Sequence, residues 1–124
     1  MEIKKVVVIG SGTMGSGIAA HLCNANIPVT LLDLKTEISE QARDRIYKSK
    51  PPLLLDKSKI NNIKVGNIKD NFDIVKDADW VVEAVVERID IKHDIYKKIF
   101  KERKKGAIVS SNTSSIPIKV LSQN

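Results

Sequence analysis

Residues 6–15 of the chain read VVVIGSGTMG, a run of β-branched apolar residues that ends on a Gly-x-Gly-x-x-Gly pattern. A short, uniformly apolar run is typical of a strand that is buried on both faces of a sheet. The glycines that follow permit a tight turn and a close approach of the backbone to a pyrophosphate, at the N-terminal end of the next helix. This stretch therefore predicts a strand, a phosphate-binding turn and a helix in succession.

A second apolar run, Val29–Asp33, ends on an acidic residue. Asp33 lies 18 residues after Gly15, and a carboxylate at that spacing accepts hydrogen bonds from the adenosine ribose of a bound dinucleotide. The same carboxylate would repel a 2′-phosphate, and Lys35 is a poor substitute for the arginine that usually receives one. The sequence thus predicts a site for NAD rather than NADP.

The rest of the chain alternates between the two kinds of element. We expect strands near residues 64–68, 79–85 and 107–110, and helices near 15–25, 36–48, 72–76 and 91–104. Such alternation predicts a doubly wound parallel α/β sheet of the Rossmann type. Right-handed crossovers would bring the loops at residues 10–15, 84–87 and 112–115 to one edge of it.

Two helical faces can be predicted from residue spacing. In the helix near residues 15–25, the small residues Gly17, Ala19 and Ala20 are expected to pack on the sheet. In the helix 36–48, Ile38, Ala42 and Ile46 recur every four residues and predict its buried face.

The composition argues against membrane proteins, secreted proteins and nucleic-acid-binding proteins. The 124 residues fit one domain. They include no apolar run long enough for a transmembrane helix, and we expect no signal peptide because no such pattern precedes the first strand. The net charge of +6 comes mainly from scattered lysines, with few aromatic residues among them. This pattern argues against a nucleic-acid surface, which favours arginine and stacking aromatic rings. The single cysteine, Cys23, is expected to be buried and fits a reducing cytoplasm.

Three motifs carry a family resemblance. They are GSGTMGSGIA at residues 10–19, VVEAVVERIDIK at 81–92 and SNTSSI at 111–116. Together they resemble the N-terminal NAD-binding domain of the 3-hydroxyacyl-CoA dehydrogenases, and the resemblance covers essentially the whole chain. It implies an oxidoreductase of fatty acid β-oxidation or hydroxybutyryl-CoA metabolism.

The resemblance implies roles for particular residues. Ala84, Glu87 and Lys92 match positions on the nicotinamide side of the cofactor, and Asn112 shapes the serine loop. Ser114 matches the serine whose hydroxyl contacts the nicotinamide end and the 3-oxygen of the substrate. Ser49 and Lys57 fall near family contacts to coenzyme A. The pyrophosphate would be held by the backbone amides of Ser11, Gly12, Thr13, Met14 and Gly15, and Gly10 also belongs to the cofactor-binding turn.

The catalytic base of the family is a histidine in an H-F-F-N-P segment beyond the serine loop, and the 124 residues do not include it. We therefore expect an incomplete dinucleotide-binding domain over residues 1–124, without the last strand of its sheet and without the C-terminal acyl-CoA and dimerisation domain. A complementary C-terminal chain or a second copy would then pair with the exposed edge at residues 107–110. Two alternatives stay open: an inactive NAD-binding remnant of a split gene, and an NAD-sensing regulatory module.

Overall fold

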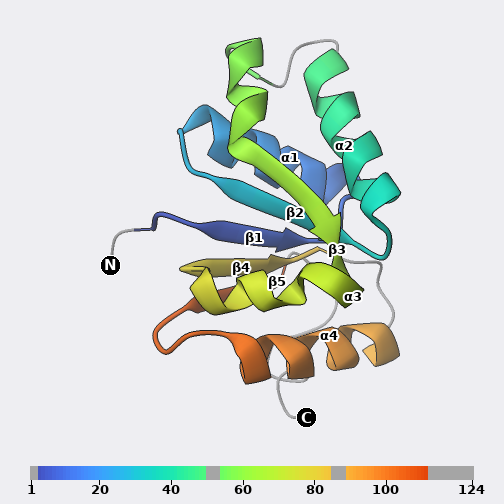
Figure 1. Cartoon of the computed structure of the whole chain (residues 1–124), viewed down its shortest axis with the longest axis vertical. Coiled ribbons are helices and arrows are strands. Elements are labelled where there is room, and N and C mark those ends of the chain that lie inside the picture. Colours follow the sequence, from blue (N-terminus) through green and yellow to red (C-terminus); the bar gives the residue numbers. More distant parts are fainter. Residues whose placement is uncertain (1–2, 50–53, 85–88, 112–124) are drawn as a thin grey trace.

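The computed structural model describes residues 3–49, 54–84 and 89–111 and forms one parallel sheet flanked by helices (Figure 1). The sheet has the order β3-β2-β1-β4-β5, and every pair of neighbours is parallel. This arrangement confirms the predicted doubly wound sheet. The strands are β1 (Val6–Ile9), β2 (Val29–Asp33), β3 (Ile63–Asn67), β4 (Trp80–Glu83) and β5 (Ile108–Ser111).

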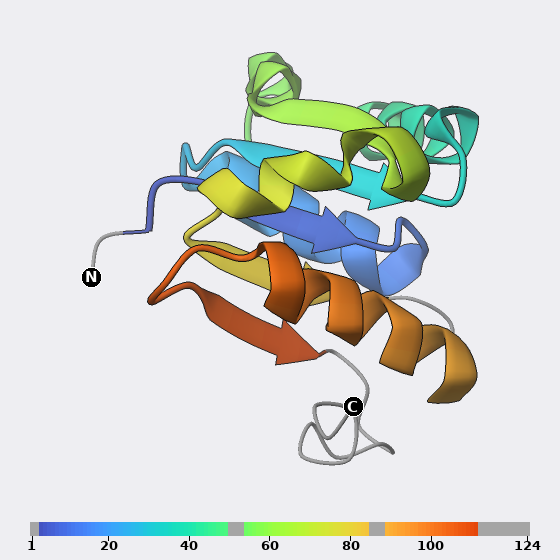
Figure 2. The same ribbon diagram turned by 60° about the horizontal axis from the view of Figure 1, so that its bottom comes forward.

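The helices lie in two layers, one on each face of the sheet (Figure 2). On one face lie α1 (Thr13–Asn24) and α2 (Thr36–Lys48), and on the other lie α3 (Ile68–Asn71), the 3₁₀ helix η2 (Phe72–Asp77) and α4 (Ile89–Glu102). A further 3₁₀ helix, η1 (Lys57–Asn62), leads into β3. The change of face follows from right-handed crossovers, because the chain builds outward from β1 first in one direction and then in the other.

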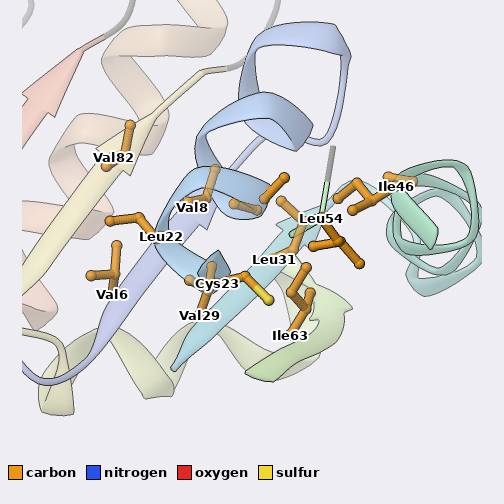
Figure 3. Packing of buried hydrophobic residues seen from close by; sticks show 13 residues of the cluster. Val6, Val8, Leu22, Cys23, Val29, Leu31, Ile46, Leu54, Ile63 and Val82 are labelled. Carbon is orange, nitrogen blue, oxygen red and sulfur yellow. The ribbon is translucent and has the colours of Figure 1, made fainter. Parts of the chain in front are cut away.

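The first strand explains the uniformly apolar run that opens the chain. Val6 and Val8 point into the core beneath α1 and α2, which Figure 3 shows from close by. Val7 and Ile9 point into the second core, beneath η2 and α4. All four side chains are buried. Successive strand residues face opposite sides, so a strand covered on both sides needs apolar residues at every position.

The predicted helical faces are partly wrong. Ile38 is 37% exposed, whereas Ser39 is fully buried beside Ala42 and Ile46. At about 100° per residue, position 38 lies about 80° around the helix from Ile46, whereas position 39 lies only about 20° from it. The hydroxyl of Ser39 lies 2.8 Å from the Gly66 carbonyl oxygen and donates to it, which satisfies the buried polar group.

On α1, Ala19 and Ala20 are buried as predicted, but Gly17 is only half-buried. A Cβ atom on residue 17 would meet nothing within 4 Å. Two residues along a helix correspond to a rotation of about 200°, so Gly17 and Ala19 face opposite sides. Cys23 is buried on α1, as expected.

Asp79 ties three segments together at the amino ends of the strands. Its Oδ2 accepts hydrogen bonds from the backbone N–H groups of Lys4 and Lys5, at 2.8 and 3.0 Å. Its Oδ1 pairs with the Lys104 ammonium group. The Lys104 bond and these backbone donors lower the pKa of Asp79 from 3.8 to about 2. The carboxylate thereby holds the starts of β1 and β4 against the turn before β5.

Candidate cofactor-binding site

The carboxyl ends of the central strands lie side by side at one edge of the sheet (Figure 1). The Gly10 amide nitrogen donates to the Leu32 oxygen at 2.7 Å, and the Ala84 amide nitrogen donates to the Ile9 oxygen at 2.7 Å. Gly10, Asp33 and Ala84, which follow or end β1, β2 and β4, are thus neighbours on this carboxyl edge. The strands β2 and β4 lie on opposite sides of β1, so the chain leaves β1 in one direction across the sheet and later continues in the other. Open α/β sheets bind ligands at such a switch point.

The turn after β1 depends on two glycines. Gly10 has a φ of 106°, a conformation that residues with a Cβ rarely adopt. At Gly15 the restriction is steric, because a Cβ atom there would lie 1.8 Å from the Gly10 carbonyl oxygen. The first turn of α1 therefore lies directly against the end of β1.

The N-terminal end of α1 presents free backbone donors. The helix begins at Thr13 after the N-cap Gly12, with no side-chain cap and no acidic residue in its first turn. The Ser16 amide makes a hydrogen bond to the Gly12 oxygen at 2.9 Å, so the amides of Thr13, Met14 and Gly15 precede the first helical bond. A Cβ atom on Gly12 would meet nothing within 4 Å, which leaves space for a ligand to approach. Free amides and the helix dipole together favour an anion here.

Asp33 is bound to the glycine turn through Ser11. Its Oδ2 accepts from the Ser11 amide nitrogen at 2.7 Å and from the Ser11 hydroxyl at 2.5 Å, while Oδ1 accepts from the Leu34 amide at 2.7 Å. An ionised carboxylate offers about four acceptor positions, so Asp33 keeps capacity for a further donor. The Ser11 amide is already engaged with Asp33, which distinguishes it from the amides that follow in the turn.

The carbonyl group of Ser11 is held by side chains from two helices. Its oxygen accepts from the Ser16 hydroxyl at 2.9 Å and from Nη2 of Arg45 at 3.1 Å. Sequence reasoning gave no reason to place Arg45 at the turn, because it lies 34 residues away, on α2. A helical pattern of charges does not indicate which charged side chain reaches back to a distant loop.

The family model described as "3-hydroxyacyl-CoA dehydrogenase, NAD binding domain" matches residues 5–124. The chain belongs to this family. The predicted resemblance and the predicted cofactor, NAD, are thereby confirmed. The match includes the glycine turn, Asp33 and the end of β4 that form the carboxyl edge.

Similar proteins are longer than this chain. A probable 3-hydroxyacyl-CoA dehydrogenase of Deinococcus radiodurans is 44% identical over 95% of the chain, which spans 36% of that protein. A putative fatty acid oxidation complex trifunctional enzyme of Rickettsia felis is 44% identical over 99% of the chain, which spans 18% of it. Among solved structures, the (S)-3-hydroxybutyryl-CoA dehydrogenase of Ralstonia eutropha has a TM-score of 0.80 at 31% identity, and the match covers 97% of this chain and 44% of that one.

The remaining predicted residues of this NAD-binding domain fall into two groups. Ala84 lies on the carboxyl edge beside Ile9. Lys92 lies within α4, of which the backbone is described at that position. Glu87, Asn112 and Ser114 lie outside the described residues, so their predicted roles stay predictions.

The two residues predicted near coenzyme A lie away from the glycine turn. Ser49 is the C-cap of α2, a 13-residue helix that starts at the carboxyl edge and rises about 1.5 Å per residue away from it. Lys57 begins η1, before the amino end of β3, and its ammonium group lies 5.0 Å from the centre of the Tyr47 ring. The structure therefore does not bring these two residues together with the turn.

The described residues contain neither a metal-binding cluster nor a membrane-spanning helix. No group of three or more His, Cys, Asp or Glu side chains there is placed to hold a metal ion. No helix in the described part of the chain is both long enough and apolar enough to cross a membrane.

Proposed function

We propose that the chain binds NAD at the carboxyl edge and serves as the cofactor half of a 3-hydroxyacyl-CoA dehydrogenase. The reaction is hydride transfer between NAD and the 3-hydroxyl group of an acyl-CoA, in fatty acid β-oxidation or hydroxybutyryl-CoA metabolism. One observation carries the proposal: the glycine turn and Asp33 meet through Ser11 at the strand ends, in a chain that the family model matches over residues 5–124.

The residues present fit a dinucleotide. Asp33 would accept hydrogen bonds from the adenosine ribose with its remaining capacity. The open approach at Gly12 and the amides of Thr13, Met14 and Gly15 would hold the pyrophosphate. The described first turn of α1 carries no acidic side chain that would oppose this charge. When bound, NAD supplies the acceptor or donor of the hydride.

Further roles rest on the family resemblance. Ala84, Glu87 and Lys92 would line the nicotinamide side, and Asn112 would shape the loop that carries Ser114. Ser114 would donate a hydrogen bond to the 3-oxygen of the substrate, which polarises the carbonyl group in the reducing direction. Ser49 and Lys57 would contact the coenzyme A part of the substrate, whose length suits residues that lie away from the turn.

The proton of the 3-hydroxyl group requires a base that these residues do not supply. A serine hydroxyl is not a useful base at neutral pH without a histidine beside it. His21 is exposed on α1, and Glu83 is buried in β4 rather than open to a substrate. The family resemblance implies that the base is the histidine of an H-F-F-N-P segment, which is not among the 124 residues.

A partner at β5 belongs to the same proposal. β5 is the last strand in the described sheet, and its Ile108 side chain is 44% exposed. An edge strand with apolar surface tends to pair with further polypeptide. A complementary C-terminal chain or a second copy would cover this edge.

The compartment we propose is the cytoplasm, because the single cysteine of the chain, Cys23, fits a reducing environment.

Titration of the purified chain with NADH, followed by cofactor fluorescence, tests the proposal, with NADPH as the control. We expect saturable NADH binding and weaker NADPH binding, because Asp33 repels a 2′-phosphate. Acetoacetyl-CoA reduction by the chain alone should be undetectable. Absence of NADH binding would refute the cofactor site, and turnover by the isolated chain would refute the argument that the base is missing.

A further inference from the structure

We propose that Arg45 is a positioning residue of the cofactor site, which orients the peptide group between Ser11 and Gly12 toward the pyrophosphate. The inference rests on the proposed NAD binding and adds a residue that lies outside all three sequence motifs. Arg45 belongs to α2, which follows β2 in the sequence. It acts through the backbone of the turn rather than through contact with the ligand.

Ser11 is the point where three elements meet. Its N–H and hydroxyl groups both donate to Asp33 at the end of β2. Its carbonyl oxygen accepts from Ser16 on α1 and from Arg45 on α2. Ser11 is only 1% exposed, so its polar groups depend on these protein partners rather than on water.

The carbonyl contact determines where the next amide points. A trans peptide group is planar, and its C=O and N–H bonds point in opposite directions. Because α1 and α2 hold the Ser11 oxygen, the Gly12 N–H group points away from these two donors. Gly12 is also the position where a Cβ atom would meet nothing within 4 Å. Arg45 thereby helps to fix the direction of the Gly12 N–H group at a residue that a ligand can approach.

A guanidinium group suits this task better than a second hydroxyl group. Its bond to a carbonyl oxygen is charge-assisted and therefore stronger than a bond between neutral groups. The planar guanidinium also loses less freedom per hydrogen bond than a lysine ammonium group. We expect Arg45 to contribute more to loop order than Ser16, the other donor to the same oxygen.

The chain offers a matched control on the same helix. Arg43 carries the same charge two residues earlier, but its Nη1 donates to the Ile63 oxygen, at 3.4 Å, at the start of β3. Removal of either arginine lowers the net charge equally. Only removal of Arg45 changes the support of the glycine turn.

The experiment compares NADH affinity of the wild-type chain with that of Arg45→Met, Arg45→Lys and Arg43→Met, in 0.1 M and 1 M salt, with thermal unfolding measured alongside. We expect about tenfold weaker binding for Arg45→Met, a smaller loss for Arg45→Lys, and a change below about twofold for Arg43→Met. The Arg45→Met loss should persist in 1 M salt, where the Debye length is about 3 Å and distant charges are screened.

Three outcomes would overturn the inference while leaving the cofactor site intact. These are equal affinities for Arg45→Met and Arg43→Met, a loss that disappears at high salt, and full affinity of Arg45→Met at a temperature where it is folded. If the wild-type chain binds no NADH, the proposed function fails and this inference fails with it. The two failures are therefore distinguished by the wild-type titration.

Discussion

The contact between Gly15 and Gly10 leads to a sharp prediction for the substitution Gly15→Ala. The added Cβ atom would lie 1.8 Å from the Gly10 oxygen and 2.9 Å from the Gly10 carbonyl carbon. Real Cβ atoms essentially never approach closer than 3.0 Å. Both clashing atoms belong to the backbone at the end of the buried strand β1, so no side chain can rotate to relieve them.

The magnitude follows from the size of the required shift. The helix and the strand end would have to separate by about 1 Å, and overpacking of this kind costs roughly 1–3 kcal/mol. Since the clash involves backbone on both sides, we expect about 3 kcal/mol, the upper end of that range. For a domain of this size the melting temperature should fall by about 12 °C, at roughly 4 °C per kcal/mol.

Two other glycines of the same segment are matched controls. Gly17→Ala introduces a Cβ atom with nothing within 4 Å, and alanine in a helix interior should stabilise the domain by roughly 0.5–1 kcal/mol. Gly12→Ala is also free of clashes and should change stability by less than about 1 kcal/mol. Its methyl group would nevertheless occupy the approach of the pyrophosphate and weaken NADH binding by at least about tenfold.

Urea unfolding, followed by the fluorescence of Trp80, measures these effects. Trp80 is the one tryptophan of the 124 residues, and its Nε1 donates to the Ser110 hydroxyl at 2.7 Å, so it reports on the pairing of β4 with β5. The reasoning is refuted if Gly15→Ala is as stable as Gly17→Ala. It is also refuted if Gly12→Ala binds NADH with wild-type affinity.

Three more predictions concern single side chains. Asp33→Ala should weaken NAD binding by roughly 1.5–3 kcal/mol, the range for hydrogen bonds to a charged group, and calorimetry that finds an unchanged affinity would overturn the ribose assignment. The carboxylate of Asp79 stabilises the fold above pH 4, and this contribution should disappear as the pH falls from the unfolded pKa of 3.8 toward the folded value of about 2. Urea midpoints measured from pH 2 to pH 6 should therefore fall less steeply for Asp79→Asn than for the wild type, and parallel curves would contradict this account. Burial raises the pKa of the Cys23 thiol, so iodoacetamide should modify it in urea but not in the native protein at pH 8.

The order of elements could be predicted from the sequence because the signals are local. The boundaries of β2 and α2 agree with the predicted residues 29–33 and 36–48. The glycine turn and Asp33 were identified because a tight turn and a strand end leave a pattern within about thirty residues. The place of β5 at the end of the described sheet could be predicted by counting strands in the expected order.

The contacts of the turn could not be predicted in this way. Ser39 rather than Ile38 is buried in the core because of the way α2 is rotated over the sheet. The Ser39 hydroxyl donates to the Gly66 carbonyl oxygen, which lies on β3. The family resemblance implies that the Ser11 amide holds the pyrophosphate, whereas in the structure this amide donates to Asp33. The position of Arg45 depends on the packing of α2 beside α1.

From the sequence alone came the parallel sheet, the glycine turn after β1, the acid at the end of β2 and the family, because periodicity and motif spacing are properties of short segments. Only the tertiary structure showed that Ser11 joins Asp33, Ser16 and Arg45, since these residues belong to different elements. Hydrogen bonds between distant segments depend on the relative placement of packed helices and strands. That placement results from burying both faces of the sheet at once, which no local pattern specifies.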